Sequence, residues 1–402
     1  MRTLKRFALC LLALFCCVLP VNVAAQSLAA EQQLNACYTL MTLSLSEGDF
    51  EAALDYADQC LEMDELLDDA LRADIYLKQG YALLYLQRTE EAQTALDACL
   101  ELLPGAADAM LLKLQACAAM GDAQGAREQA RAYLEAYPEQ TEVYSVLGEL
   151  LAAMGDYAGA ADAYASYIAS VEEAPASAYE MRGQCLLQMG RYEEAVADLS
   201  RAVDLGDEAQ PRTHYLRAIA RMQLGDNEAA VEDLDVCVDY LEAEEARMAE
   251  DAEYVPEIDP DVAYSRYYRG IAHMQLGGHE AAIADFTACV EGGVNADTAR
   301  FWRGACRLDA GDYAAALEDF AACRQAGVEE ESSLYYEALC HMGLEDHEAA
   351  IEGFTECLEQ NIMPEQALYN RGMCYLQLGD MEKGQADLEA SLAQGAEQTE
   401  VG

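Results

Sequence analysis

Apolar positions recur at a fixed interval along most of the chain. Cysteines occur every 17 residues in the C-terminal part, at Cys289, Cys306, Cys323, Cys340, Cys357 and Cys374. Aromatic residues recur at twice that interval, at Tyr267, Phe301, Tyr335 and Tyr369. Self-similarity at such a period is typical of a solenoid, in which each unit buries its apolar face only against its neighbours. The pattern predicts an array of helix-turn-helix units whose function lies on an extended surface.

Each predicted unit has a small residue in the middle of its first helix. Ten units align on this position between about residues 28 and 395, at Met41, Gly80, Leu114, Gly148, Gly183, Ala218, Gly270, Gly304, Ala338 and Gly372, with Met41 and Leu114 as larger exceptions. Seven residues later the pair Gly-Asp usually follows, as at Gly155-Asp156. The glycine is suited to ending one helix, and the aspartate to capping the next. An Ala then precedes a larger apolar residue by four positions, as Ala282 precedes Phe286, which indicates close packing of the two helices.

This pattern resembles the tetratricopeptide repeat, whose 34-residue unit has small and large apolar residues at these offsets. The stretches 148–164 and 304–320 are among the closest matches, although the proline that usually ends the unit survives only at Pro104 and Pro138. The resemblance implies an all-α fold, a right-handed superhelical solenoid of about ten helix-turn-helix repeats. It also implies that the array curves and that the first helices line a concave side, where peptides or partner proteins bind.

The first residues of the chain have the pattern of a signal peptide. Three cations, an apolar run over 7–19 and the small residues Val23-Ala24-Ala25 predict a signal peptide at 1–25. The apolar run is shorter than the roughly 20 residues that span a membrane. An uncleaved anchor and a lipid anchor stay open as alternatives. The sequence therefore predicts an exported protein that is extracellular, at the cell surface or periplasmic.

The repeats divide into two arrays with one insertion. Four repeats occupy 26–174, and the proline in Glu172-Glu173-Ala174-Pro175 marks the joint. Repeats five and six occupy 175–238, repeats seven to ten occupy 263–395, and 396–402 form a tail. The segment 239–262 is an acidic insertion that we expect to extend the second helix of the sixth repeat before an acidic, proline-containing loop. It is either a solvated excursion or a binding loop or hinge.

The net charge of the chain disfavours two classes of binding partner. The chain carries 24 Lys and Arg against 74 Asp and Glu, a net charge of −50, so nucleic acids and anionic lipid surfaces are repelled. The charge keeps the array soluble and monomeric, or it matches a basic partner.

Twelve cysteines lie outside the signal segment, and in an exported chain an even number suggests disulfides. Their positions are those where Ala202 and Ala220 stand in other units, which favours small buried hydrophobes instead.

A second regularity pairs charges within the C-terminal repeats. An arginine precedes the small residue, and an aspartate stands 16 residues later. The pairs are Arg182 and Asp198, Arg217 and Asp233, Arg269 and Asp285, Arg303 and Asp319, and Arg371 and Asp387. In the ninth unit Glu337 and Gly353 take the two positions, so both members change together. We expect a structural ion pair that clamps each helix pair. A stripe of arginines for an anionic ligand is the alternative.

The resemblance places candidate partner-binding residues on the first helices. Aromatic, methionine and glutamine side chains there would suit an extended peptide. The candidates are Tyr215, Tyr267, Phe301, Tyr335, Tyr369, Met222, Met274, Met342, Gln188, Gln223, Gln275 and Gln377. An aromatic row at helical spacing is also what a packed core requires, so both interpretations stay open.

Motifs for catalysis or metal binding are missing from the sequence. There is no phosphate-binding Gly-rich loop, no Gly-x-Ser-x-Gly and no calcium loop. We expect no enzyme, no cofactor, no metal and no small-molecule substrate. The first hypothesis is an exported scaffold or adaptor that binds another protein or extended peptide through its concave helix face. The alternative is a structural spacer or assembly factor of the cell envelope without a dedicated groove.

Overall fold

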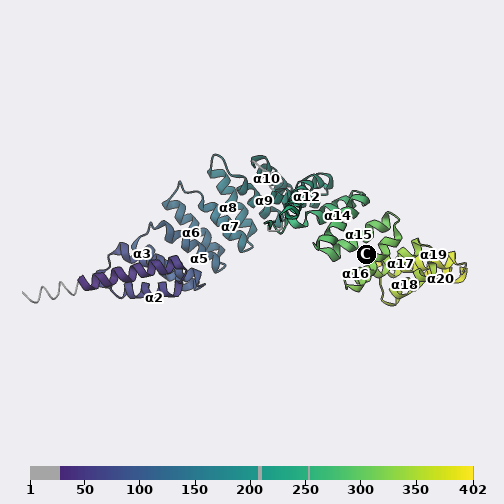
Figure 1. Cartoon of the computed structure of the whole chain (residues 1–402), viewed down its shortest axis with the longest axis horizontal. Helices are drawn as coiled ribbons and strands as arrows, with labels where there is room; N and C mark the ends of the chain where they lie inside the picture. Colours follow the sequence, from purple (N-terminus) through teal and green to yellow (C-terminus); the bar gives the residue numbers. More distant parts are fainter. Residues whose placement is uncertain (1–27, 207–210, 252–253, 402) are drawn as a thin grey trace, which may run out of the picture. The chain divides into compact units, whose positions relative to one another are not determined.

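The computed structural model describes residues 28–206, 211–251 and 254–401, and in this part of the chain it contains helices and no strand (Figure 1). The chain divides into two compact units, unit 1 up to Ala174 and unit 2 from Pro175 onward, at the joint where the sequence places a proline. The predicted signal peptide at 1–25 lies outside the described residues. The all-α fold of stacked helix pairs is confirmed.

Unit 1 consists of four helix pairs, each packed against the next. A helix over 28–47 pairs with the first of the named helices. These are α2 (Phe50–Leu61), η1 (Asp64–Leu66), α3 (Asp69–Tyr85), α4 (Thr89–Leu102), α5 (Ala107–Ala119), α6 (Ala123–Ala136), α7 (Val143–Ala153) and α8 (Tyr157–Ser170). The odd-numbered helices α3, α5 and α7 are the first helices of their repeats.

Unit 2 contains six further helix pairs. The helices of repeats five to seven are α9 (Ala176–Gln188), α10 (Tyr192–Leu205), α11 (Pro211–Gln223), α12 (Asn227–Glu250), η2 (Val262–Tyr264), α13 (Ser265–Gln275) and α14 (His279–Gly292). The helices of repeats eight to ten are α15 (Ala296–Asp309), α16 (Tyr313–Gln325), α17 (Glu330–Gly343), α18 (His347–Glu359), α19 (Pro364–Gln377) and α20 (Met381–Val401). Helix α20 continues through most of the segment expected as a tail.

The turn within each repeat uses the two residues that the sequence pattern singled out. Gly155 adopts a φ of +79°, which is unfavourable for residues with a Cβ, so the glycine ends α7. The side chain of Asp156 then accepts a hydrogen bond from the backbone N–H of Gly159 and caps α8. Gly311 and Asp312 act in the same way between α15 and α16. These local signals fix where each helix pair turns.

The two helices of a repeat approach closely where the small and large apolar residues meet. A Cβ on Gly270 would lie 2.8 Å from the Phe286 ring, and one on Gly183 would lie 2.8 Å from Leu199. Both large side chains are fully buried. The glycine therefore makes room for the side chain that fills the core between the helices.

The twelve cysteines of the described residues are all free and all buried. Burial raises the pKa of the Cys185 thiol to about 11 and that of Cys340 to about 12, so both stay protonated and unreactive at neutral pH. Cys289 and Cys306 pack among Ala282, Phe286 and Ala299. The cysteines therefore act as small core residues, and none of the described ones forms a disulfide.

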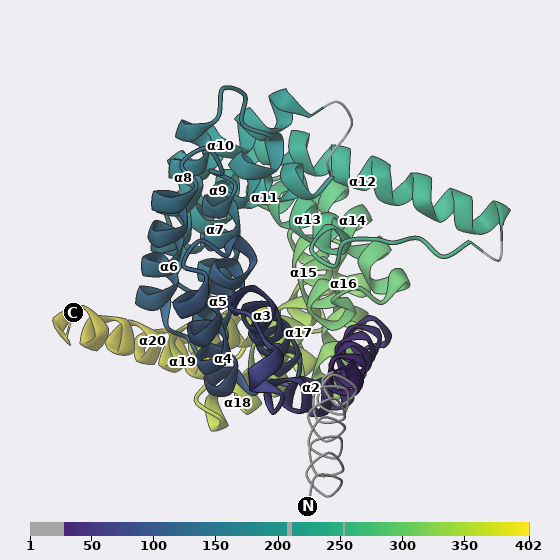
Figure 2. The ribbon, with the colours of Figure 1, turned by 90° about the vertical axis from the view of Figure 1, so that its left-hand side faces the viewer.

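The acidic insertion lengthens α12 to 24 residues, so that it extends past its neighbours in unit 2 (Figure 2). The chain then runs back over 254–261 to η2. Glu244 on α12 is buried, accepts a hydrogen bond from the Tyr254 hydroxyl and pairs with Arg247. Ile258 packs against the core of the sixth repeat. The insertion is thus anchored to its repeat at both ends.

Candidate functional site

The structure brings the two members of each predicted ion pair together. The shortest nitrogen-to-oxygen distance is 2.6 Å in four of the pairs and 2.7 Å in the fifth. All five aspartates are buried, whereas the arginines keep part of their surface. Two guanidinium nitrogens of Arg182 donate to the two carboxylate oxygens of Asp198, which is the bidentate geometry of a strong charge-assisted contact.

Asp233 on α12 is the most heavily coordinated of these carboxylates. It accepts hydrogen bonds from Arg217 and Arg221 of α11 and lies 2.8 Å from Nδ1 of His214. Burial alone would raise the pKa of Asp233, but the contacts with His214 and Arg217 hold it below the ordinary value. The carboxylate therefore stays ionised in the protein interior because α11 surrounds it with donors.

Several arginines also reach the second helix of the preceding repeat, which the sequence pattern did not reveal. Arg303 donates to Thr287 on α14, and Arg371 donates to Thr355 on α18. Arg269 pairs with Asp235 of α12 at 2.8 Å. Each of these arginines thus joins its own repeat to the one before it.

The ninth repeat reverses the charges. Glu337 stands in the arginine position, and its carboxylate lies 3.1 Å from the guanidinium of Arg324 on α16 of the preceding repeat. Burial raises the pKa of Glu337. Gly353 replaces the aspartate, and a Cβ there would lie 2.8 Å from Cβ of Ala338. The contact between repeats is kept, while the contact within the repeat becomes apolar.

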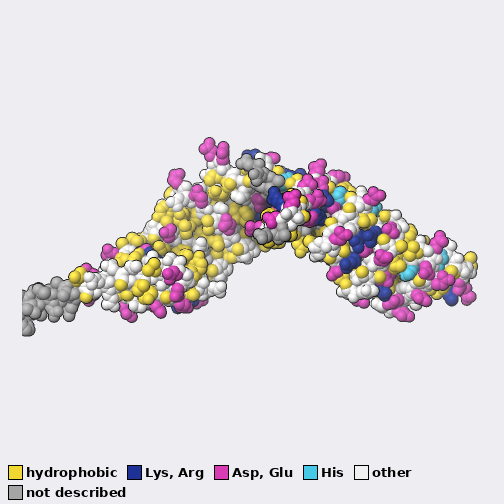
Figure 3. All heavy atoms as spheres, viewed as in Figure 1, with side chains coloured by type: hydrophobic (Ala, Val, Ile, Leu, Met, Phe, Trp, Pro, Cys, Tyr) yellow, Lys and Arg dark blue, Asp and Glu magenta, His cyan; other side chains and the backbone are white. Residues whose placement is uncertain are grey.

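Lys and Arg side chains gather near α14 and α15 of unit 2, among acidic ones (Figure 3). Arg266 pairs with Glu245, and Arg300 pairs with Asp297. Arg307 donates to Asp319, which already accepts from Arg303. These cations are thus paired with acids of the same chain, which is the arrangement expected of internal neutralisation.

The row of candidate aromatic residues is mostly core, which corrects the expectation of partner contact there. Tyr215, Phe301 and Tyr335 are only 8%, 6% and 7% exposed. The Phe301 ring packs edge-on against Phe320 of its own repeat at 5.7 Å between centroids, and Tyr335 packs against Phe354 at 5.8 Å. These rings fill space within a repeat and between successive repeats, so they offer little surface to a partner.

The remaining candidates keep varying amounts of surface. Tyr369 is 51% exposed, whereas Tyr267 is half-buried. The half-buried methionines are Met222, Met274 and Met342. The exposed glutamines, each the last residue of its helix, are Gln188, Gln223, Gln275 and Gln377. The structure therefore does not bring the twelve candidates together into one continuous exposed stripe.

An apolar hollow lies instead in unit 1, between the first helices of the second and third repeats. It has a volume of about 390 Å³. The residues that line it are Leu77, Lys78 and Tyr81 of α3 and Asp108, Leu111 and Leu112 of α5. Leu77, Tyr81 and Tyr85 follow each other at intervals of four on α3, which places them on one face. This spacing is a sequence signal for the hollow. The candidate residues came instead from unit 2, where the repeat pattern is more regular.

Aromatic rings extend the apolar surface beyond the hollow. Tyr81 lies against Tyr85, with 4.8 Å between centroids, and Phe50 of α2 stacks on Tyr85 at 4.6 Å. The Tyr85 side chain is nevertheless 59% exposed. A large ring that is held in place and still exposed is the kind of surface that protein interfaces use.

The single cation of the hollow is fixed by its neighbours. Lys78 Nζ lies 2.5 Å from Asp74 Oδ1 and donates to the Tyr38 hydroxyl at 3.2 Å. The Tyr38 hydroxyl in turn donates to Asp74 at 2.6 Å. Burial lowers the pKa of Lys78, but the Asp74 carboxylate more than offsets this and raises it. The ammonium is therefore charged and already neutralised within the chain.

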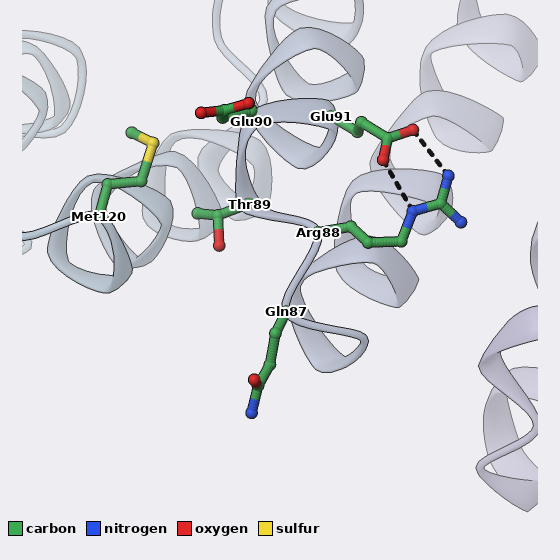
Figure 4. A pocket seen from close by; sticks show the side chains of 6 residues that line it. All are labelled: Gln87, Arg88, Thr89, Glu90, Glu91 and Met120. Carbon is green, nitrogen blue, oxygen red and sulfur yellow. Dashed lines mark hydrogen bonds and ion pairs between the residues drawn. The ribbon is translucent and has the colours of Figure 1, made fainter.

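A second, more polar hollow of about 290 Å³ lies where α3 turns into α4, beside the end of α5 (Figure 4). Arg88 forms a bidentate pair with Glu91, at 2.7 Å and 2.8 Å. Thr89 and Glu90 stand next to it on the α4 side, and Met120 faces them from the end of α5. Both hollows therefore lie where the second and third repeats meet, one near the start of α5 and one at its end.

The described part of the chain contains neither a candidate metal site nor a candidate membrane-spanning helix. No group of three or more His, Cys, Asp or Glu side chains there could hold a metal ion. No described helix combines the length and apolar character that crossing a membrane requires.

The comparisons with known families decide the classification. Models of the tetratricopeptide repeat match residues 77–141, 145–211, 186–247 and 267–327, and a further one matches 365–393. Together they cover more than half of the chain. The chain belongs to the tetratricopeptide repeat family. Repeats of this family generally form non-catalytic scaffolds that bind other proteins or peptides, which suggests a protein-interaction scaffold.

Several solved structures are similar to the chain. The C-terminal part of a tetratricopeptide repeat protein from Cytophaga hutchinsonii is 16% identical, with a TM-score of 0.47, and the match covers 64% of this chain and 97% of that one. A tetratricopeptide repeat protein from Parabacteroides merdae is 16% identical, with a TM-score of 0.40, 67% of this chain and 98% of the other being covered. MamA from Desulfovibrio magneticus is 17% identical, with a TM-score of 0.37 and coverage of 43% and 94%. No curated protein matches significantly.

Proposed function

We propose that this tetratricopeptide repeat protein is a non-enzymatic, exported scaffold that binds a segment of another protein along the first helices of unit 1. The observation that carries the proposal is the apolar hollow between α3 and α5, with Tyr81 and Tyr85 beside it. A solenoid presents a long surface, so a partner segment that lies across α3 and α5 contacts two repeats at once.

The hollow suits one apolar side chain of such a segment. Leu77, Leu111 and Leu112 supply its walls, and burying an apolar side chain against them is favourable by about 25 cal/mol per Å². Hydrophobic side chains also gather on the face of unit 1 that Figure 3 shows. The binding energy comes from the apolar walls of the hollow, and the polar residues that line it, Lys78 and Asp108, set the partner's orientation.

The fixed cation adds preorganisation. Lys78 is held by Asp74 and Tyr38 before any partner arrives, so its side chain loses little freedom on binding. Unit 2 offers less apolar surface to a partner, because most rings of its aromatic row are buried in the core. Unit 1 is therefore the binding unit in this proposal, and unit 2 extends the scaffold.

The remaining parts of the proposal rest on sequence. The N-terminal pattern of cations, apolar run and small residues supports export to the cell surface, the extracellular space or the periplasm. The net charge of −50 disfavours nucleic acids as partners and favours a monomer that stays soluble.

A capture experiment tests the binding site. Leu111→Asp places a carboxylate in the apolar wall and is expected to weaken partner capture from the native extracellular or envelope fraction at least tenfold, or by about 1.4 kcal/mol. The matched variant Leu224→Asp changes an exposed leucine of unit 2 and should capture as the wild type does. Equal capture by both variants, with helicity unchanged by circular dichroism, would reject the site and favour a spacer without a groove.

A further inference from the structure

The cations of unit 1 are all engaged within the chain. Residues 28–174 contain 27 Asp and Glu and six Lys and Arg. Each of these six cations forms an ion pair in the described structure, namely Arg72 with Asp64, Lys78 with Asp74, Arg88 with Glu91, Lys113 with Asp97, Arg127 with Asp156 and Arg131 with Glu135. The surface of unit 1 therefore has an excess of acids and no unpaired cation among the described residues.

The same imbalance is found at each hollow. In the apolar hollow, Lys78 is paired with Asp74, whereas Asp108 on α5 is exposed and has no ion pair within the described residues. At the second hollow, Arg88 is paired with Glu91. Glu90 is exposed, points away from Arg88 and, in the part of the chain that the structure covers, is likewise without an ion pair (Figure 4).

We infer that the partner segment is cationic, with an apolar side chain in the hollow between α3 and α5 and Lys or Arg residues beside Asp108 and Glu90. The inference rests on the proposed function and specifies the chemistry of the partner. Asp108 stands in the first turn of α5, and Glu90 lines the hollow beside Met120 at the other end of α5, so a segment that extends along α5 meets both carboxylates.

Charge decides between a cationic and an acidic segment. The cations that an acidic segment would meet at the hollows, Lys78 and Arg88, are already paired with Asp74 and Glu91, and the segment would also meet the uncompensated carboxylates of the unit. Interactions between exposed charges act over about 8 Å at physiological ionic strength, so the acids near the hollows contribute together. A cationic segment gains from the same field and leaves both internal pairs intact.

Three synthetic peptides serve as probes. They share one Leu and one Phe and differ in the flanking residues, which are Lys in the first, Ser in the second and Glu in the third. Fluorescence anisotropy measures their binding to the full chain at low and at physiological ionic strength. The Lys peptide is expected to bind at least tenfold more tightly than the Ser peptide, equivalent to about 1.4 kcal/mol, with a smaller difference at the higher ionic strength.

Neutralising the two carboxylates tests the assignment to the hollows. The double variant Asp108→Asn with Glu90→Gln is expected to lose most of the preference for Lys over Ser. The matched control, Glu149→Gln with Asp162→Asn, removes two exposed acids from other helices of unit 1 and should keep it. Equal loss in both double variants would contradict the inference, because it would show that general attraction to an acidic chain accounts for the binding.

Leu111→Asp separates failure of the inference from failure of the proposed function. If this variant weakens all three peptides but the Lys peptide has no advantage, the hollow binds and the cationic chemistry is wrong. If it weakens none of them, or if none of the three peptides binds, both the inference and the proposed function are wrong. Circular dichroism confirms in each case that the helices are intact.

Discussion

Replacing Asp233 with Ala is expected to lower the free energy of unfolding by about 3–5 kcal/mol, because it leaves the largely buried cations Arg217 and Arg221 without their counter-charge. Asp233 is 2% exposed and accepts from Arg217 and Arg221, with His214 also in contact. Urea unfolding of the full chain, followed by circular dichroism, measures the loss. Removing one partner from a buried, hydrogen-bonded network is costlier than removing an exposed ion pair, which is worth about 0–1 kcal/mol.

The neighbouring acid provides the control for this variant. Glu232→Ala changes an exposed residue of the same helix and should alter the free energy of unfolding by no more than about 0.5 kcal/mol. A loss for Asp233→Ala as small as that of Glu232→Ala would show that the network does not stabilise the fold.

The pH dependence of the same variant follows from the lowered pKa of Asp233. A carboxyl whose pKa is lower in the folded than in the unfolded protein contributes stability above its ordinary value of 3.8. That contribution is lost as the pH falls through the lower, folded-state pKa. The difference in stability between wild type and Asp233→Ala should therefore be full at neutral pH and shrink below pH 3.8.

Replacing Gly270 with Val is expected to lower the free energy of unfolding by about 1–3 kcal/mol through overpacking. A Cβ at this position would lie 2.8 Å and 3.0 Å from two carbons of the buried Phe286 ring. The gain in helix propensity from removing a glycine is below about 1 kcal/mol and does not offset this clash. Gly292→Val on α14, where nothing lies within 4 Å, is the matched control and should have a much smaller effect.

The sixth repeat suggests how to relieve the clash. It carries Ala218 and Leu234 where the seventh carries Gly270 and Phe286, and both are buried in one core cluster. Gly270→Ala should therefore cost less in the Phe286→Leu background than in the wild type. Equal cost in both backgrounds would mean that the two side chains do not compete for space.

The fold followed from the sequence because its signals are local and repeated. Gly155 and Asp156 define a turn through backbone conformation and capping, which depend on a few adjacent residues. The constant offset of 16 residues between Arg303 and Asp319 placed both on facing helices, where the structure has them at 2.6 Å. Each repeat carries the same pattern of turn and packing residues, so a signal that is weak in one repeat is reinforced by its recurrence in the next.

The candidate site was harder to place because burial depends on contacts between repeats. The position of Phe301 within its helix is compatible with either a concave surface or a core, and only the neighbouring rings of Phe320 and Tyr336 decide for the core. The hollow in unit 1 arises where Leu77 and Leu111 of successive first helices leave space between them. No single repeat contains that information.

The most direct test of the central claim, that the seam between α3 and α5 binds a partner, is site-specific photo-crosslinking in the native extracellular or envelope fraction. A photoreactive benzoylphenylalanine replaces Leu111 in one sample and Leu224 in a control sample. The account predicts a covalent adduct from position 111 to a cationic, apolar segment of one other protein, and none of that adduct from position 224. No adduct at position 111, or the same adducts from both positions, would contradict it.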